Sequence, residues 1–190
     1  FNYRVQKFDS NLNFLAKWGR LSVGIVGGEF DSPQGVAVDS NDNIYVSDTD
    51  NERIQVFDKN GSYLRQFGSL GAGDGQFQAP RDLVIDNAGI IYVVDRTNNN
   101  VQILDNNGNF LRKFGDRGTG IGEFCNPMGI ALDNDLNLYV ADSANDRIQK
   151  FDNNGNYLDQ FGSAGTGDNQ FDYPRSIAVD DEGQIYVLDT

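Results

Sequence analysis

The chain has 190 residues, of which 15 are basic and 28 acidic, and its formal net charge is −13. This charge repels nucleic-acid phosphates and anionic lipid surfaces, so we expect RNA binding to be weak or absent. No apolar run approaches the roughly 18 residues of a membrane span, and no basic start followed by an apolar block suggests a signal peptide. The first residue is not Met, which indicates a processed or excised segment.

One pattern returns along the whole chain at a constant offset of 47 residues. It is carried by four prolines and by the Tyr-Val pair that follows each of them. Self-similarity at such a period indicates a repeat architecture, and the length fits one all-β domain over residues 1–190. The repeated positions are Pro33, Pro80, Pro127 and Pro174, with Tyr45-Val46, Tyr92-Val93, Tyr139-Val140 and Tyr186-Val187.

The chain begins inside a repeat unit. Residues Phe1 to Phe8 align with Asp50 to Phe57, so the chain begins between the second and third strands of a unit. Residues 11–13 replace an Asn-Gly turn, and Trp18-Gly19 ends the fourth strand. A loop from Arg20 to Ser32 then leads to the first complete unit.

The unit that starts at Pro33 reads as four short strands. Residues 36–38 form a short apolar run, as expected for an inner strand buried on both faces. Further strands are predicted at 44–46, 54–57 and 63–67. The turn at Asn60-Gly61, and its copies at Asn107-Gly108 and Asn154-Gly155, suit the positive φ of tight hairpins. Four antiparallel strands in fewer than fifty residues indicate a propeller blade, and no apolar set has helical spacing.

Glycine-rich loops join the units. Phe67-Gly68 closes one unit and Phe77 precedes the next proline, and we expect this aromatic pair to anchor the loop over the gap between neighbouring blades. Cys125 is the only cysteine, so no disulfide forms within the chain. It is interpreted as a loop filler, because the chain has no His to activate it.

The end of the chain is in register with its beginning. Asp189-Thr190 align with Asp48-Thr49, so the next residue in register would match Phe1. We therefore predict four four-stranded blades in units starting near residues 33, 80, 127 and 174, one of them split between 1–32 and 174–190. The split blade closes either within one chain or between chains, because a propeller avoids open sheet edges in this way.

The run GVAVDSNDNIYVSDTDNERIQVFDKNGSYLRQFG closely resembles an NHL repeat, and three further copies cover essentially the whole chain. The resemblance implies a β-propeller of five or six blades with the first strand of each near the axis. It also implies a binding platform. Some animal members bind RNA through a basic face, and relatives include a zinc-dependent amidating lyase. This chain departs from that pattern, since it is acidic, has four units and lacks the His ligands of the lyase site.

Repeated aspartates follow the second strand of each unit. They could form a carboxylate ring that holds a cation or polar ligand, or they could cap the turn and pair with a nearby Arg. Repetition favours the structural role, because sites usually break symmetry. Residues 39–43 and 133–137 likewise fit hairpin turns better than calcium loops, so no metal or cofactor is predicted. The repeated aspartates are Asp48, Asp95, Asp142 and Asp189.

The residues that vary inside this constant frame are the candidate ligand-binding set. They follow each proline at the mouth of the expected channel, where ligands of such folds commonly bind, or they follow the second strand. An alternative is that they are merely solvated loop residues. The set is Gln34, Arg81, Asp82, Arg96, Met128 and Arg175, and three of its members carry the scarce positive charge.

The leading functional hypothesis is a noncatalytic binding or assembly scaffold that engages a protein, peptide or glycan through the loop face. The alternative is a metal-assisted lactonase- or lyase-like enzyme, which would need inward-pointing acidic residues, whereas the inner strands offer Val, Ala, Ile and Leu. Self-association through the terminal strands is also expected. Cysteine usage does not fix the compartment, and an extracellular or cell-surface location is the one favoured.

Overall fold

The computed structural model describes residues 2–22 and 26–190. Phe1, which was aligned with Asp50, and residues 23–25 of the loop after Arg20 lie outside the described residues. The described chain is all-β, as predicted, and only short 3-10 turns interrupt its strands. No helix in these ranges is long and apolar enough to cross a membrane.

Three complete blades follow the predicted units. Each is a four-stranded antiparallel sheet whose strands occur in chain order. The first contains β3 (Pro33–Val38), β4 (Ile44–Asp48), β5 (Arg53–Phe57) and β6 (Tyr63–Phe67), with the 3-10 turn η1 (Thr49–Asn51). The second contains β7 (Pro80–Ile85), β8 (Ile91–Asp95), β9 (Asn100–Leu104) and β10 (Phe110–Phe114). The third contains β11 (Pro127–Leu132), β12 (Leu138–Asp142), β13 (Arg147–Phe151) and β14 (Tyr157–Phe161), with η2 (Ser143–Asn145).

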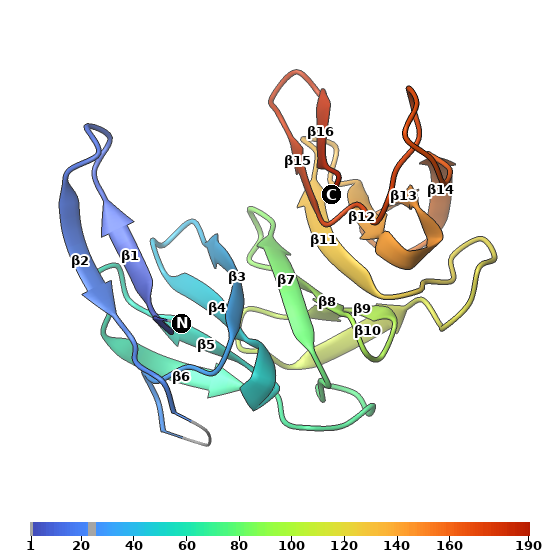
Figure 1. Ribbon diagram of the computed structural model, residues 1–190. Helices are drawn as coiled ribbons and strands as arrows, with labels where there is room; N and C mark the ends of the chain where they lie inside the picture. The colour runs from blue at the N-terminus through green and yellow to red at the C-terminus, as the bar shows by residue number, and fades with distance from the viewer. Residues whose placement is uncertain (1, 23–25) are drawn as a thin grey trace.

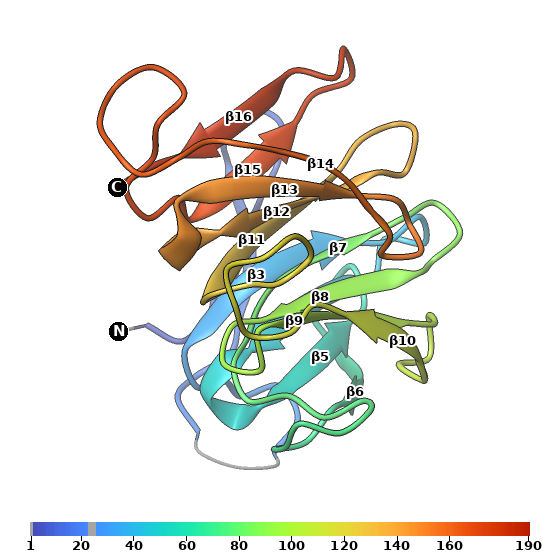
Figure 2. The same ribbon diagram turned by 90° about the vertical axis from the view of Figure 1, so that its right-hand side faces the viewer.

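Two half blades flank these sheets. The strands β1 (Val5–Phe8) and β2 (Phe14–Trp18) pair only with each other among the described residues, and so do β15 (Ser176–Val179) and β16 (Ile185–Leu188). Figure 1 shows the five sheets as an open arc, with β3, β7, β11 and β15 on its concave side and the two half blades at opposite ends. In Figure 2, the third blade lies between the β15–β16 pair and the second blade.

The two half blades therefore do not close a four-bladed ring within this chain. Among the described residues, β1–β2 and β15–β16 form two separate sheets. Neighbouring blades pack against each other through continuous apolar layers. Pairing between a β1 and a β16 of different chains stays a prediction.

The apolar layers fill the space between neighbouring blades. Phe77 is fully buried among residues of the first two blades, and Phe124 lies in the same place between the second and third. A Cβ on Gly68, which has φ of 97°, would lie 2.7 Å from the Phe77 ring. The predicted aromatic anchor of each loop is thus confirmed, and glycine is required where the loop leaves the strand.

The inner strand β3 differs from the prediction of burial on both faces. Val36 and Val38 are each 58% exposed, whereas Leu83 and Ile130, which follow the corresponding prolines on β7 and β11, are 2% exposed. The difference arises because the two valines face the β1–β2 sheet, which has no inner strands of its own in the described chain.

Buried aspartates join each blade to the loop before it. Asp142 ends β12 with no exposed surface, and Arg147, on the neighbouring strand β13, places its Nε 2.7 Å from Oδ2 of Asp142. The Arg147 guanidinium also donates to the carbonyls of Gly120 and Glu123, so the pair fixes the Gly-rich loop. The other donors to Asp142 are the N–H of Cys125 at 2.7 Å, the Asn145 amide at 2.9 Å and the Gln149 amide at 3.0 Å. The predicted structural role of these aspartates is thereby supported.

Replacing Asp142 by Ala should lower the free energy of unfolding by about 3–5 kcal/mol, because the buried Arg147 guanidinium would lose its counter-charge. Asp189 is the matched control, since it holds the same repeat position but is exposed and accepts one hydrogen bond, from the N–H of Asp172. Asp189→Ala should cost about 1 kcal/mol or less. Urea denaturation of the two variants measures the difference, and equal losses would contradict the structural role of the buried carboxylate.

Candidate functional site

The candidate site lies at one end of the inner strands. We call this the loop face; it consists of the segments that enter β3, β7, β11 and β15 and those that leave β4, β8, β12 and β16. Below it, the concave side of the arc forms an apolar channel of about 360 Å³. The channel is lined by Val36, Ala37, Val38, Leu83, Val84, Ile85, Ile130, Ala131, Leu132, Ile177, Ala178 and Val179.

Close backbone contacts hold the loop face in place. A Cβ on Gly129 would lie 2.8 Å from the carbonyl oxygen of Arg175, and one on Gly35 would lie 2.8 Å from Cα of Asp82. Neighbouring inner strands therefore approach so closely that these positions accept no side chain. The backbone beside Arg81 and Arg175 is consequently part of a packed interface between blades, not of a free loop.

Three of the six sequence-predicted residues come together here. Arg81 is the second residue of β7, Arg175 directly precedes β15, and Arg96 directly follows β8. Pro80 pairs with Asp95, so Arg81 and Arg96 stand at the same end of the neighbouring strands β7 and β8. Burial first, and then the positive charges of Arg96 and Arg175, lower the pKa of Arg81, so both charges act on the Arg81 guanidinium.

None of these arginines has an acidic partner within ion-pair distance in the described ranges. The ion pairs there join other residues, such as Arg53 with Asp48 and Arg147 with Asp142. The Arg175 guanidinium carbon instead lies 5.8 Å from the centre of the Tyr173 ring, which is a cation–π contact.

Arg96 replaces a hydroxyl residue at a repeat position that links one blade to the next. In the first and third blades, Thr49 and Ser143 hold this position, and their hydroxyls donate to the carbonyls of Pro80 and Pro174 in the next blade, at 2.7 and 2.6 Å. Arg96 makes no such bond, and its Nε is buried without a hydrogen-bond partner. A buried unpaired donor costs about 1–3 kcal/mol, so its retention here requires an explanation.

The other three predicted residues have different surroundings. Asp82 is largely buried, and its carboxylate accepts from the N–H of Leu83 at 3.0 Å and of Ile130 at 3.2 Å. Burial raises the pKa of Asp82. Met128 is only 6% exposed, so it does not offer an open contact. Gln34 is exposed and lies in a separate hollow with Pro33. Asp82 therefore serves the contact between the second and third blades.

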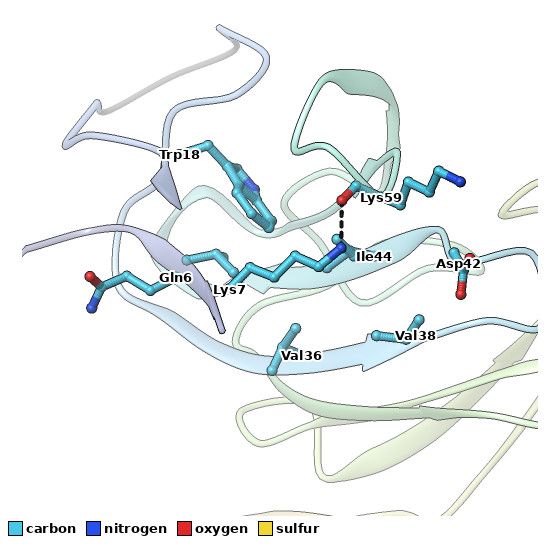
Figure 3. A pocket seen from close by; sticks show the side chains of 9 residues that line it. Gln6, Lys7, Trp18, Val36, Val38, Asp42, Ile44 and Lys59 are labelled. Atoms are coloured by element: carbon cyan, nitrogen blue, oxygen red, sulfur yellow. Dashed lines mark hydrogen bonds between the residues drawn. The ribbon is translucent and has the colours of Figure 1, made fainter. Parts of the chain in front are cut away.

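Sequence reasoning missed Tyr173 and an apolar cavity. Tyr173 stands where the other units have Ser32, Ala79 and Asn126, so its departure from the repeat was the available signal. The cavity, of about 310 Å³, lies beside β1 and β3 (Figure 3). In this view Val36 and Val38 point into it, and Lys7 spans it to donate to the carbonyl of Lys59 at 2.9 Å. Nothing in the sequence indicated that the cavity would be open.

Family models match most of the described blades. A model of the NHL repeat matches residues 30–57. A model of a 6-bladed beta-propeller matches residues 87–150 and 134–190, which together exceed half of the chain. Similar curated proteins are Protein brain tumor from Drosophila melanogaster, 44% identical over 61 residues, and the B-box type zinc finger protein ncl-1 from Caenorhabditis elegans, 45% identical over 53 residues. These matches cover 32% and 28% of this chain but 6% of each relative.

Solved structures share the fold at low identity. A protein of unknown function from Bacteroides thetaiotaomicron has a TM-score of 0.70 at 21% identity, over 92% of this chain and 48% of its own. Virginiamycin B lyase from Staphylococcus aureus has a TM-score of 0.69 at 13% identity, over 98% of this chain and 56% of its own. The chain spans about half the length of these proteins. With these repeats, blades and family matches, the chain belongs to the 6-bladed beta-propeller family, and its residues 30–57 match the NHL repeat.

Proposed function

We propose that this domain is a noncatalytic binding module that engages a protein, peptide or glycan through the loop face. The observation that carries the proposal is a contrast between two kinds of residue at that face: those that join the blades and those that lie beside them. The glycines and aspartates that join the blades are fully used in packing and hydrogen bonds. Arg81 and Arg175 occupy the positions next to them with no acidic partner in the described structure, as expected of residues selected for contact with a ligand.

The alternative, a metal-assisted lactonase- or lyase-like enzyme, is favoured by likeness in fold alone. Virginiamycin B lyase with one histidine replaced by alanine is described as catalytically inactive, whereas this 190-residue chain has no His. The channel is lined by apolar side chains, and no group of three acidic, His or Cys residues within 2–22 and 26–190 is placed to hold a metal. These observations support binding over catalysis for this chain.

We also propose that the terminal half blades complete each other between copies of the chain. In a complete interface, Tyr92 and Val94 of one blade pack against Ile130 and Leu138 of the next. Tyr186 and Leu188, at the same repeat positions as Tyr92 and Val94, are 56% and 59% exposed. Val36 and Ile44 hold the positions of Ile130 and Leu138, and they line the open cavity of Figure 3. Ile44 is only 7% exposed, but Val36 is 58% exposed, so the exposed Tyr186 and Leu188 have an apolar counterpart at the matching repeat position. Burial of this apolar area favours association.

Replacing Arg81 and Arg175 by Ala should abolish or weaken ligand binding while the fold persists. Arg175 is exposed and Arg81 is half-buried, so the double variant should lose only about 1 kcal/mol of stability, and urea denaturation should separate binding from folding. The matched control is the double variant Lys59→Ala/Arg112→Ala, which removes the same charge from exposed positions in the β5–β6 turn and on the outer strand β10, outside the loop face. The measurement is a screen of peptide and glycan arrays with all three proteins. Ligands that bind the loop-face variant as well as the wild type would argue against this surface.

Association of copies should depend on concentration and on Tyr186. Light scattering after size exclusion should show a mass above that of one chain, and Tyr186→Asp should shift it to the monomer because a charge would be buried between blades. Leu111→Asp is the control, since Leu111 is 47% exposed on the outer strand β10. A wild-type monomer at every concentration would refute head-to-tail completion.

A further inference from the structure

Three guanidinium groups converge at the loop face without an acidic partner. Arg81, Arg96 and Arg175 come from the second blade and the last half blade, and the charges of Arg96 and Arg175 reach Arg81. Like charges in a partly buried place repel one another, so the arrangement is unfavourable in the free protein. It becomes favourable when an anion is bound, because the anion supplies the missing counter-charge.

The local carboxylates do not fill this role. Asp82 is the acidic group nearest to Arg81 in sequence, and its two oxygens already accept from the N–H groups of Leu83 and Ile130. Asp95, which precedes Arg96, accepts backbone N–H groups of Gln78 and Ala79 at 2.8 and 3.1 Å. Both carboxylates are thus held by backbone donors. The charge of Asp82 partly offsets that of Arg81, but the ion pairs of the described residues do not include Arg81, Arg96 or Arg175.

Arg96 supplies an independent observation. Its Nε is buried and has no hydrogen-bond partner, although the equivalent Thr49 and Ser143 side chains are both bonded to the next blade. A guanidinium offers five donors in a planar fork that suits carboxylate and phosphate oxygens. Of the three complete blades, the second is the one in which Arg96 replaces the hydroxyl residue found at Thr49 and Ser143. Arg81 belongs to the same blade.

We propose that Arg81, Arg96 and Arg175 form a binding site for a single oxyanion group, a carboxylate or a phosphate, carried by the ligand of the loop face. The Tyr173 ring, in cation–π contact with Arg175, forms one side of this site. The net charge of −13 favours an isolated anionic group over a polyanion such as RNA, since repulsion grows with every further charge. This inference rests on the proposed binding role of the loop face, but its test needs no identified partner.

The test is a titration of the wild-type chain with sodium phosphate and with sodium acetate, each against sodium chloride at equal ionic strength. Arginine Nε–Hε resonances, assigned with single Arg→Gln variants, report on each guanidinium separately. We expect saturable shifts of the Arg96 signal with a dissociation constant of about 1 mM or lower. A response to phosphate alone favours a phosphate-bearing ligand, a response to acetate alone favours a carboxylate, and a response to both supports a site for either oxyanion.

Arg96→Gln should weaken anion binding at least about fivefold, because a charge-assisted bond is lost, while Arg112→Gln, on the outer strand β10, should leave it unchanged. Urea denaturation of both variants confirms that they are folded. The proposal is overturned if neither anion gives a saturable shift at the three arginines, or if Arg112→Gln weakens binding as much as Arg96→Gln. If the wild-type chain binds an anion at these arginines but binds no peptide or glycan on the arrays, the result counts against the proposed function alone.

Discussion

The buried carboxylate that ends the second strand of each complete blade is the interaction on which the arrangement depends. Asp48 has no exposed surface, yet it accepts hydrogen bonds from Arg53 and Gln55 on the third strand and from the N–H of Asp31 in the preceding loop. A charge without solvent must be surrounded by donors, so strand, loop and carboxylate can form only together. Each blade is thereby joined to its entry loop, and the loop carries the Phe that fills the interface with the preceding blade.

The middle blade satisfies the same requirement by a different route. Asn100 stands where the other two complete blades have Arg53 and Arg147, so no guanidinium reaches Asp95. Asp95 instead accepts N–H groups from both flanking loops, and Asn100 Oδ1 is left buried without a partner. Arg96, with its unpaired Nε, lies in the short loop that leads into β9, of which Asn100 is the first residue. These two unsatisfied polar atoms mark the place where the repeat has departed from the arrangement that stabilises its neighbours best.

The sequence predicted the parts of the structure that repeat, because the constraints on them are local. Strand spacing, the turn at Gly61, with φ of 85°, and the buried Asp142 follow from periodicity and from backbone chemistry within one unit. The openness of the arc, the exposure of Val36 and the burial of Met128 depend on contacts between units. No single unit encodes the angle at which two blades pack, so these features could not be read from the period alone.

The candidate site likewise combines features that one repeat unit determines with features that depend on contacts between units. Sequence variation within a constant frame brought Arg81, Arg96 and Arg175 into one set, but it could not separate them from Asp82, whose role is visible only through its bond to Ile130 in the next blade. Charges on a protein surface are screened beyond about 8–10 Å at physiological salt. A guanidinium cluster therefore attracts an anionic group locally even on a chain of net charge −13, while a long polyanion remains in reach of the acidic surface. Local attraction by the guanidinium cluster and repulsion by the surrounding acidic surface together favour one anionic group, presented by an otherwise neutral or basic ligand.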